Sequence, residues 1–465
     1  MRISRTVGLM AAAVCAWQLA EHKLAASDFS ERMAAYNVGP ATGRVAPAAH
    51  REPAPRAANP PAAPHSNPAP RSPWHEMAYG GYDAGGAMSC GPMSCGSMGC
   101  GAAGCGPGGN AGPQGYETCC GKTLWWANFE LLLWWRQGRD LPPLATTDTI
   151  AGSSTSAGIL PGAEILFGGR RETSQMKAGG RLDIGFWLDE SQCWGIGNRF
   201  YALGRDSAHL RIDTLDNPII AIPFFNGSAD EEEALLVSFP GLFSGSLDID
   251  GSSEVLGNDL YGRFLICRDD NSRLDFITGW SFSRINDDLL IRSSRAVTET
   301  GGNIPLGTES DVLDRFQTRN EFHGGILGLM HEANCGCWSL HTMARMSLGN
   351  MNERVIIAGS TSITVPGEDP EVLDTGLFAG ESNIGEFERN EFTAITEVGV
   401  KLGYNVGEFT KLTVGYSFLY WNDVVRAGDQ IDRQIDVDGG EQPRFAFDRS
   451  DFWVQGVNLG LVCEF

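Results

Sequence analysis

Long apolar runs and positive charge are both scarce in this sequence of 465 residues, and each scarcity excludes a class of protein. Beyond the N-terminal leader no stretch approaches 18 consecutive apolar residues, so a transmembrane helix is not expected. The chain has 35 Lys and Arg residues against 57 Asp and Glu residues, a net charge of −22. This acidity repels phosphate backbones and argues against nucleic acid as a partner.

Catalytic signatures are missing as well. The chain contains no G-x-S-x-G elbow, no H-E-x-x-H pair and no phosphate-binding loop. We therefore expect no enzyme, no cofactor and no resident metal.

Composition divides the chain into four parts. Residues 1–26 have a basic start and a short apolar core, as in an export signal whose cleavage site is not clearly marked. Residues 27–79 are rich in Pro and Ala and predict an extended linker. Residues 80–121 are dominated by Gly and Cys, so we expect a disordered arm. Residues 122–465 hold the aromatic and β-branched residues of a folded β domain, with 27 basic and 50 acidic side chains.

Half of the 12 cysteines lie in the arm, four of them five residues apart and two adjacent: Cys90, Cys95, Cys100, Cys105, Cys119 and Cys120. An exported protein meets an oxidising compartment, so disulfides are the first interpretation. A metal site without His and unpaired, low-complexity thiols are the alternatives. Cys193, Cys335 and Cys337 in the folded domain are further disulfide candidates.

Period-two alternation is the main signal in residues 122–465. At the C-terminus Trp453, Val457, Leu459 and Leu461 alternate with small or polar residues, and Phe465 ends the apolar face. Similar alternation recurs in the segments 181–188, 273–282, 394–404 and 412–418. Apolar residues toward lipid and polar residues toward a lumen are typical of an all-β, antiparallel transmembrane β-barrel. We expect outer-membrane lipid as its surroundings and Phe465 as the signal for the barrel assembly machinery.

The connections alternate in length without a break. Short links fall at 189–193, 268–272, 333–337 and 407–409, and long ones near 140–177, 207–256, 292–320, 363–390 and 423–449. Outer-membrane barrels have short periplasmic turns and long external loops. The count gives ten strands, or twelve if residues 234–250 form one more hairpin.

Four charged residues on the polar face, Arg181, Asp183, Glu397 and Lys401, are candidates to line a pore. They would tune ion selectivity in an open lumen, or form a network that plugs a closed one. The net charge of −23 in residues 122–465 favours cations.

A symmetric set, His331, Cys335, Cys337 and His341, surrounds Gly336. If Gly336 is the tip of a hairpin, His331 faces His341, and the four could bind zinc. The simpler interpretation is a turn with two thiols and two imidazoles in the lumen.

The chain resembles the planctomycete outer-membrane family known as β-barrel porin type seven. The resemblance is carried by LLLWWRQGRDLPPLATT (131–147), SSEVLGNDLYGR (252–263), LDFITGWSFSRINDDLLI (274–291), DRFQTRNEFHGGILGL (314–329), GYSFLYWNDVVRAGDQID (415–432) and SDFWVQGVNLGLVCEF (450–465). It implies an outer-membrane barrel of porin type and carries over no substrate or catalytic residue.

Three functions remain open at this point. The first is passive passage of small solutes with a cation bias. The second is a structural envelope protein, anchored by disulfides from its arm to other envelope proteins. The third is a surface receptor or adhesin that uses the long loops. Ten strands enclose a narrow lumen, which side chains could block.

Overall fold

The computed structural model describes residues 124–148, 153–171, 175–299, 304–407, 409–437 and 439–464. The expected export signal, linker and Gly/Cys arm lie outside these residues, as does Phe465. No helix within the described part of the chain is long and apolar enough to cross a membrane.

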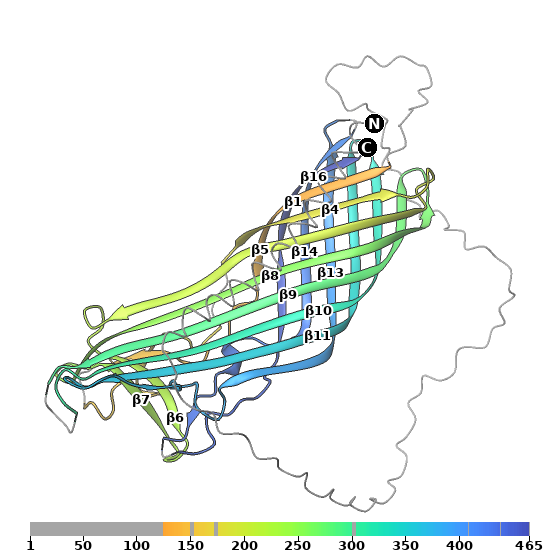
Figure 1. The fold of residues 1–465 in the computed structure, drawn as a ribbon. Helices are drawn as coiled ribbons and strands as arrows, with labels where there is room; N and C mark the ends of the chain where they lie inside the picture. Colours follow the sequence, from red (N-terminus) through yellow and green to blue (C-terminus); the bar gives the residue numbers. More distant parts are fainter. Residues whose placement is uncertain are drawn as a thin grey trace, which may run out of the picture. The chain divides into compact units, whose positions relative to one another are not determined.

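Ten antiparallel strands close into a barrel (Figure 1). Nine pairings run in the order β10-β9-β8-β5-β4-β1-β16-β14-β13-β11, and pairing of β10 with β11 closes the ring. The barrel strands are β1 (Trp125–Arg136), β4 (Lys177–Trp187), β5 (Trp194–Asp213), β8 (Phe243–Arg268), β9 (Ser272–Val297), β10 (Glu309–Cys335), β11 (Trp338–Thr364), β13 (Gly385–Asn405), β14 (Thr410–Val424) and β16 (Ser450–Glu464). The predicted transmembrane β-barrel of ten strands is confirmed.

The additional hairpin considered for residues 234–250 does not add two strands to the ring. β7 (Glu231–Ser238) pairs with β6 (Ile220–Asn226) in a separate small sheet. Residues 243–250 instead begin the long strand β8 and pair with β5 and β9. The alternation in this segment is real, but its two halves belong to different sheets.

An apolar band surrounds the barrel at the end of the short turns. On β16, Leu459 and Leu461 point outward and are exposed, whereas Asn458 points inward and is buried, as the alternation predicts. β1 has a Trp pair near each end, 125–126 and 134–135, and in each pair one residue, Trp125 or Trp135, is exposed on the outer face. Their neighbours point inward, because successive side chains of a strand face opposite sides.

The four longest strands, β8 to β11, continue far beyond this band (Figure 1). Above Phe282 on β9 the outward positions turn polar, beginning with Arg284, while inward Ile285 and Leu289 are buried. β10 changes in the same way, with Arg319 outward and Phe316 inward. The extension therefore has the pattern of a water-soluble barrel, apolar inside and charged outside. It replaces much of the loops predicted at 207–256 and 292–320, which shorten to 214–242 and 298–308.

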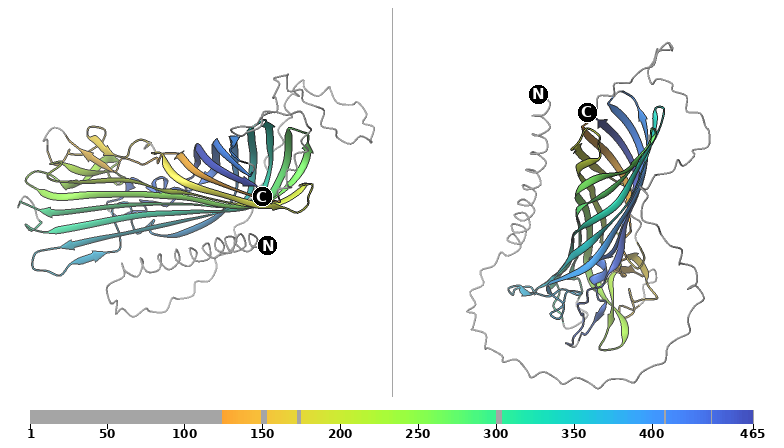
Figure 2. Two further views of the ribbon diagram at one scale, coloured as in Figure 1. Left: turned by 90° about the horizontal axis from the view of Figure 1, so that it is seen from above. Right: turned by 90° about the vertical axis from the view of Figure 1, so that its right-hand side faces the viewer.

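A small mixed sheet lies at the long-loop end of the barrel (Figures 1 and 2). It consists of β6 and β7 with β2 (Ala145–Thr147), β3 (Glu164–Phe167) and β15 (Gln434–Ile435). The 3-10 turn η1 (Gly428–Gln430) and β12 (Glu371–Leu373), an addition to the edge of β11, complete the elements. Loop residues such as Leu144, Ile220 and Val425 share one apolar cluster with barrel residues such as Ile249 and Phe316. This packing makes the loops and the upper barrel one folded body.

The other end of the barrel is formed by short turns closed by local hydrogen bonds. The Asp189 carboxylate accepts hydrogen bonds from the Ser191 hydroxyl and from the N–H groups of Cys193 at 3.0 Å and Trp194 at 2.8 Å. These bonds, the one from Ser191 first, lower the pKa of Asp189 to about 2. The turn between β4 and β5 therefore keeps its charged, closed form at any physiological pH.

The turn between β10 and β11 corrects the proposed zinc set. Its last pair is Cys335 with Trp338, so Gly336 and Cys337 form the tip together. His341 consequently lies opposite Glu332, and His331 lies opposite Thr342. A shift of one residue places the two imidazoles on opposite faces of the sheet, so the four side chains cannot share one ion.

The apolar band generates a test with an internal control. Leu327 lies at the centre of the band on the outer face of β10 and is 50% exposed. We expect Leu327→Arg to lower the free energy of unfolding in lipid vesicles by about 2–4 kcal/mol, because the charge must enter hydrocarbon. The control, Gln317→Arg, changes the same face of the same strand above the band. Urea titration of the two variants would contradict this placement of the membrane if both lost the same stability.

Candidate functional site

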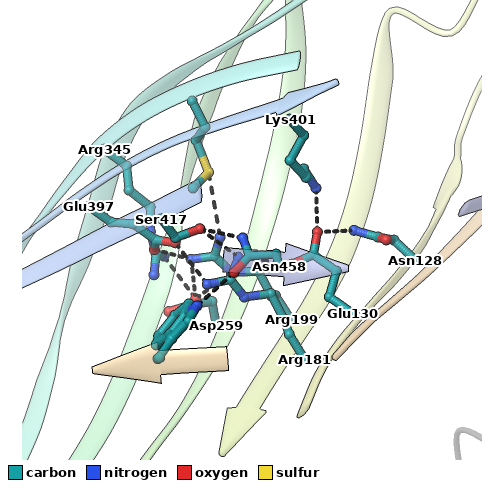
Figure 3. A network of polar contacts seen from close by, with 12 residues as sticks. Asn128, Glu130, Arg181, Arg199, Asp259, Arg345, Glu397, Lys401, Ser417 and Asn458 are labelled. Atoms are coloured by element: carbon teal, nitrogen blue, oxygen red, sulfur yellow. Dashed lines mark hydrogen bonds and ion pairs between the residues drawn. The ribbon is translucent and has the colours of Figure 1, made fainter. Parts of the chain in front are cut away.

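The inward face of the barrel brings charged and polar residues from seven strands into one layer (Figure 3). Each lies at a position where alternation turns its side chain into the lumen, where no lipid can reach it. The members of this layer, called here the central network, are Asn128 and Glu130 (β1), Arg181 and Asp183 (β4), Arg199 (β5), Asp259 (β8), Arg345 (β11), Glu397 and Lys401 (β13) and Ser417 (β14).

Glu397 is the hub of the central network. Its carboxylate accepts hydrogen bonds from Arg199, from Nε of Arg345 at 2.6 Å and from Arg181 at 3.5 Å. The three guanidiniums come from β4, β5 and β11, and neither β4 nor β5 is a neighbour of β13 in the sheet. The contacts from Arg181 and Arg199 to Glu397 therefore cross the lumen, whereas Arg345 lies on the neighbouring strand β11.

Two further carboxylates complete the ionic contacts. Asp259 pairs with Arg199 at 3.1 Å and with Arg345 at 2.8 Å. Glu130 accepts from Arg181 at 3.1 Å and from Lys401 at 2.8 Å. Both carboxylates are almost completely buried, at 1% and 0% exposure. Burial of this kind requires charged partners, since an unpaired carboxylate in the interior is strongly disfavoured.

Aromatic residues hold the edges of the network. Asp183 accepts hydrogen bonds from the Tyr261 hydroxyl at 2.8 Å and from Nε1 of Trp126 at 3.3 Å. The Arg181 guanidinium lies 5.0 Å from the centre of the Trp134 ring, a cation–π distance. Trp134 in turn donates to Asn458 at 2.6 Å. The charged layer is thus continuous with the packed side chains around it.

All four residues predicted to line the lumen, Arg181, Asp183, Glu397 and Lys401, lie inside the barrel and belong to this network. Sequence reasoning did not single out Glu130, Arg199, Asp259 and Arg345. The available signal was their position on the inward face of a strand. Alternation does not say which inward charges meet across the lumen, because that depends on the tilt of the strands.

Formal charges cancel in the central network. Arg181, Arg199, Arg345 and Lys401 balance Glu130, Asp183, Asp259 and Glu397. The cavity next to Arg199, Tyr261 and Arg345 measures about 10 Å³. A volume of this size is at the lower limit for a single water molecule.

Two more layers fill the barrel above the central network. The first is an apolar cluster to which nine strands contribute: Leu132, Trp134, Tyr201, Leu203, Val255, Ile285, Phe322, Met351, Ile395, Leu419, Trp421, Val424, Phe452 and Val454. The second is charged and buried: Arg136 pairs with Asp206, and Arg139 lies 3.3 Å from Asp287. The described interior therefore alternates between ionic and apolar layers.

Larger cavities occur at the two ends. At the short-turn end a cavity of about 290 Å³ is lined by residues that include Trp126, Trp187, Arg273 and Glu332. At the long-loop end a cavity of about 700 Å³ is lined by residues that include Arg139, Arg171 and His209. The layers described above lie between the two.

The cysteines of the described part of the barrel differ in state. Cys335 and Cys337, at the tip of the β10–β11 turn, are disulfide-bonded. Cys193, proposed as a disulfide candidate, is a free thiol whose Sγ lies 4.0 Å from the Ser191 carbonyl oxygen. The strands β8 and β9 lie between Cys193 and the β10–β11 turn, so Cys193 is too far away to bond to either cysteine of that turn. The six arm cysteines lie outside the described residues.

Among the described residues, one group has the spacing of metal ligands, and sequence reasoning missed it. His209 on β5 faces Asp250 on β8, and Asp248 completes the group on the outer face of the barrel extension. The Arg211 guanidinium already pairs with Asp248, and two of the three side chains are half exposed. The group is accounted for as surface ion pairs.

Comparison with known proteins identifies the fold family. The family model described as "Putative beta barrel porin-7 (BBP7)" matches residues 126–465, nearly the whole described barrel. No curated protein matches the sequence.

Several solved structures match this chain at low similarity. The outer membrane protease OmpT from Escherichia coli is 12% identical with a TM-score of 0.37, over 74% of this chain and 98% of that one. A Pseudomonas aeruginosa FadL homologue is 8% identical with a TM-score of 0.21, over 74% and 91%. The monoaromatic hydrocarbon channel TodX, as a deletion mutant, is 9% identical with a TM-score of 0.19, over 74% and 90%. Similarity at this level carries no argument about activity.

The central network predicts a large difference between two carboxylates of β13. Glu397→Gln removes the charge that three buried guanidiniums share, and we expect the free energy of unfolding to fall by about 3–5 kcal/mol. Glu388→Gln is the control: Glu388 lies on the same strand, is more than half exposed and is 3.6 Å from Arg354. Its loss should cost no more than about 1 kcal/mol. Equal effects in urea titrations would contradict the role of Glu397 as hub.

Proposed function

Since the chain belongs to the BBP7 family, we propose that it is an outer-membrane β-barrel that is closed at rest and holds a folded domain at the cell surface. The proposal rests on one observation above all, the continuous filling of the barrel interior. We also propose that the protein is not an enzyme, because the charged residues of the described interior pair with one another.

The orientation follows from the rule for outer-membrane barrels. Short turns face the periplasm and long loops face outward. The apolar band then lies near the periplasmic side, and the extension of β8 to β11 projects from the outer surface. With this orientation the small sheet and the cavity of about 700 Å³ are exposed to the surroundings of the cell.

Closure is supported by contacts that span the lumen. Glu397 joins strands on different sides of the ring, and the cavity beside its partners Arg199 and Arg345 is about 10 Å³. A hydrated ion would have to separate several buried ion pairs to pass this layer, and each separation exposes an uncompensated charge in a medium of low polarity. Above it the ion would meet Trp134, Phe322 and Trp421, which are completely buried.

The packed outer domain supports a role in surface recognition. Its loops share an apolar cluster with the barrel, so their positions are determined in advance of binding. Arg139, Arg171 and His209 line the outer cavity with polar and basic groups. We propose that this domain is the part of the protein that contacts a partner, as in a receptor or adhesin.

Passive passage of small solutes is the second candidate, and the family description as a porin favours it. A cation bias would then have to arise at the two mouths. The central network contributes none, because its four cationic and four anionic groups balance. Any such bias would therefore come from the excess of acidic residues outside the central network.

Planar bilayer recordings separate the two candidates. We expect the purified full-length protein to show no steady conductance. The double variant Arg345→Ala/Glu397→Ala removes an ion pair at 2.6 Å without changing the net charge and should produce a measurable pore. The control is the double variant Arg389→Ala/Glu353→Ala, which also leaves the net charge unchanged. It removes an ion pair inside the barrel on the long-loop side of the apolar cluster, so this variant should stay closed.

Steady conductance of the unmodified protein would overturn the closed barrel. A salt gradient then distinguishes the remaining possibilities. A cation-selective reversal potential would favour passive passage with a cation bias, whereas an anion-selective one would contradict that bias.

A further inference from the structure

Two amide side chains face lipid within the apolar band. Asn198 on β5 and Asn258 on β8 occupy outward positions, because the residues that follow them, Arg199 and Asp259, point inward and are buried. The next outward residues along each strand are apolar: Ile196 and Phe200 on β5, and Leu256 and Leu260 on β8. A polar group at this depth finds no hydrogen-bond partner in hydrocarbon.

The two amides are hydrogen-bonded to each other, and this contact fixes their orientation. They come from strands that are paired neighbours in the ring (Figure 1). The Nδ2 group of Asn198 donates to Oδ1 of Asn258 at 3.1 Å and to the main-chain carbonyl oxygen of Asp259 at 3.1 Å. A carbonyl oxygen can only accept, so the nitrogen of Asn198 must face it. Asn258 must then present its oxygen to the same nitrogen.

Each amide therefore has one end without a partner among the described residues. Asn198 uses both of its N–H bonds, and no described donor reaches its Oδ1. Asn258 uses its oxygen, and its Nδ2 group reaches no described acceptor. The outer face of the barrel thus offers one acceptor and one donor close together in the apolar band. Lipid chains satisfy neither of them.

An acceptor beside a donor is a self-complementary pattern. A two-fold axis along the membrane normal, placed between β5 and β8, brings Asn258 of each copy toward Asn198 of the other. Each free donor then meets a free acceptor. A second copy of this chain is the one occupant whose chemistry is certain to match, because it carries the same two groups on the same strands.

The surroundings of the amides fit the same arrangement. The order β9-β8-β5-β4 in the ring means that this axis places β9 of one copy opposite β4 of the other. Trp280 on β9 is 43% exposed on the outer face. Gly180 on β4 pairs with Ala202 on β5, and a Cβ added at Gly180 would meet nothing within 4 Å. A large side chain is therefore set against small ones, which allow close approach in a membrane.

We propose that two copies of the chain form a dimer in the membrane through the outer face of β5 and β8, with Asn258 Nδ2 of each copy donating to Asn198 Oδ1 of the other. Two hydrogen bonds form and none is given up, since lipid supplied no partner. This use of the lipid-facing surface goes beyond the function proposed above. It does not depend on whether the barrel conducts.

Photocross-linking of the full-length protein in isolated membranes tests the contact. Leu260→p-benzoylphenylalanine carries the photoreactive group on β8 beside the amides, where Leu260 is 51% exposed. The control, Leu402→p-benzoylphenylalanine, carries it on the outer face of β13 at the opposite side of the ring. We expect a species of twice the monomer mass from the first variant and none from the second. Gels are run with reductant, so that disulfides contribute nothing.

Cross-links from position 260 to lipid alone, to a different protein or within a trimer would overturn the proposal. So would an equal yield of dimer from position 402.

A second pair of variants tests the amides themselves. Asn198→Leu/Asn258→Leu removes both amides and keeps the outer face apolar, so the barrel should stay folded. The control, Gln455→Leu, removes an outward amide of β16 that pairs with Trp135, away from the proposed contact. In sedimentation equilibrium in detergent we expect the dissociation constant of the dimer to rise roughly tenfold or more in the double variant and to stay unchanged in the control.

Heat-modifiable migration on gels shows whether the variant barrels fold. A monomeric unmodified protein, an unchanged dissociation constant in the double variant, or an equal rise in the control would contradict the dimer. The bilayer recordings use none of these variants, so failure of one proposal leaves the other to be judged separately.

Discussion

Closure of the ring between β10 and β11 is the constraint on which the other features depend. A sheet that crosses a bilayer must have no free edge, because an unpaired N–H or C=O group in hydrocarbon is very costly. These two strands pair along their whole length, from Glu309 with Thr364 to Cys335 with Trp338. Once the ring is closed, every inward side chain is enclosed with the others. Whether the lumen is open or filled then depends on the size and charge of these inward side chains.

In this protein the enclosed side chains satisfy one another. The carboxylates of Glu130, Asp259 and Glu397 are buried beside guanidiniums, and none of these contacts can be removed singly without leaving a buried charge. Such pairs add little net stability compared with a well-packed apolar core. Their effect is to specify one arrangement, since the alternatives leave polar groups without partners.

The fold could be predicted from the sequence to a large extent because alternation has a period of two and lipid allows no ambiguity about which face is apolar. The C-terminal strand with Leu459 and Leu461 outward is the clearest example. Prediction failed where the outer face meets water. At Arg284 the polarity of β9 reverses, so a continuing strand has the composition of a loop. A renewed alternation with Ile285, Leu289 and Ile291 on the other face was the signal that was missed.

The candidate site was harder to predict. Arg181, Asp183, Glu397 and Lys401 could be placed in the lumen, but their partners come from strands far apart in the ring. The tilt of the strands determines which levels meet, and no local pattern encodes the tilt. The β10–β11 turn shows the same limit at a smaller scale. A tip centred on Gly336 and a tip shared with Cys337 differ by one residue, yet they place His341 on opposite faces.

The unbroken strands β8 to β11 also have a mechanical consequence. They run from the short turns through the membrane to the outer domain, adding roughly 40 Å of strand at about 3.4 Å per residue beyond the band. Hydrogen bonds of antiparallel strands lie perpendicular to the strand direction. A pull on the outer domain along the strands therefore loads the whole ladder in shear, and the bonds must yield together instead of opening one at a time. The lipid-embedded barrel and the domain above it would resist tension as a single tether.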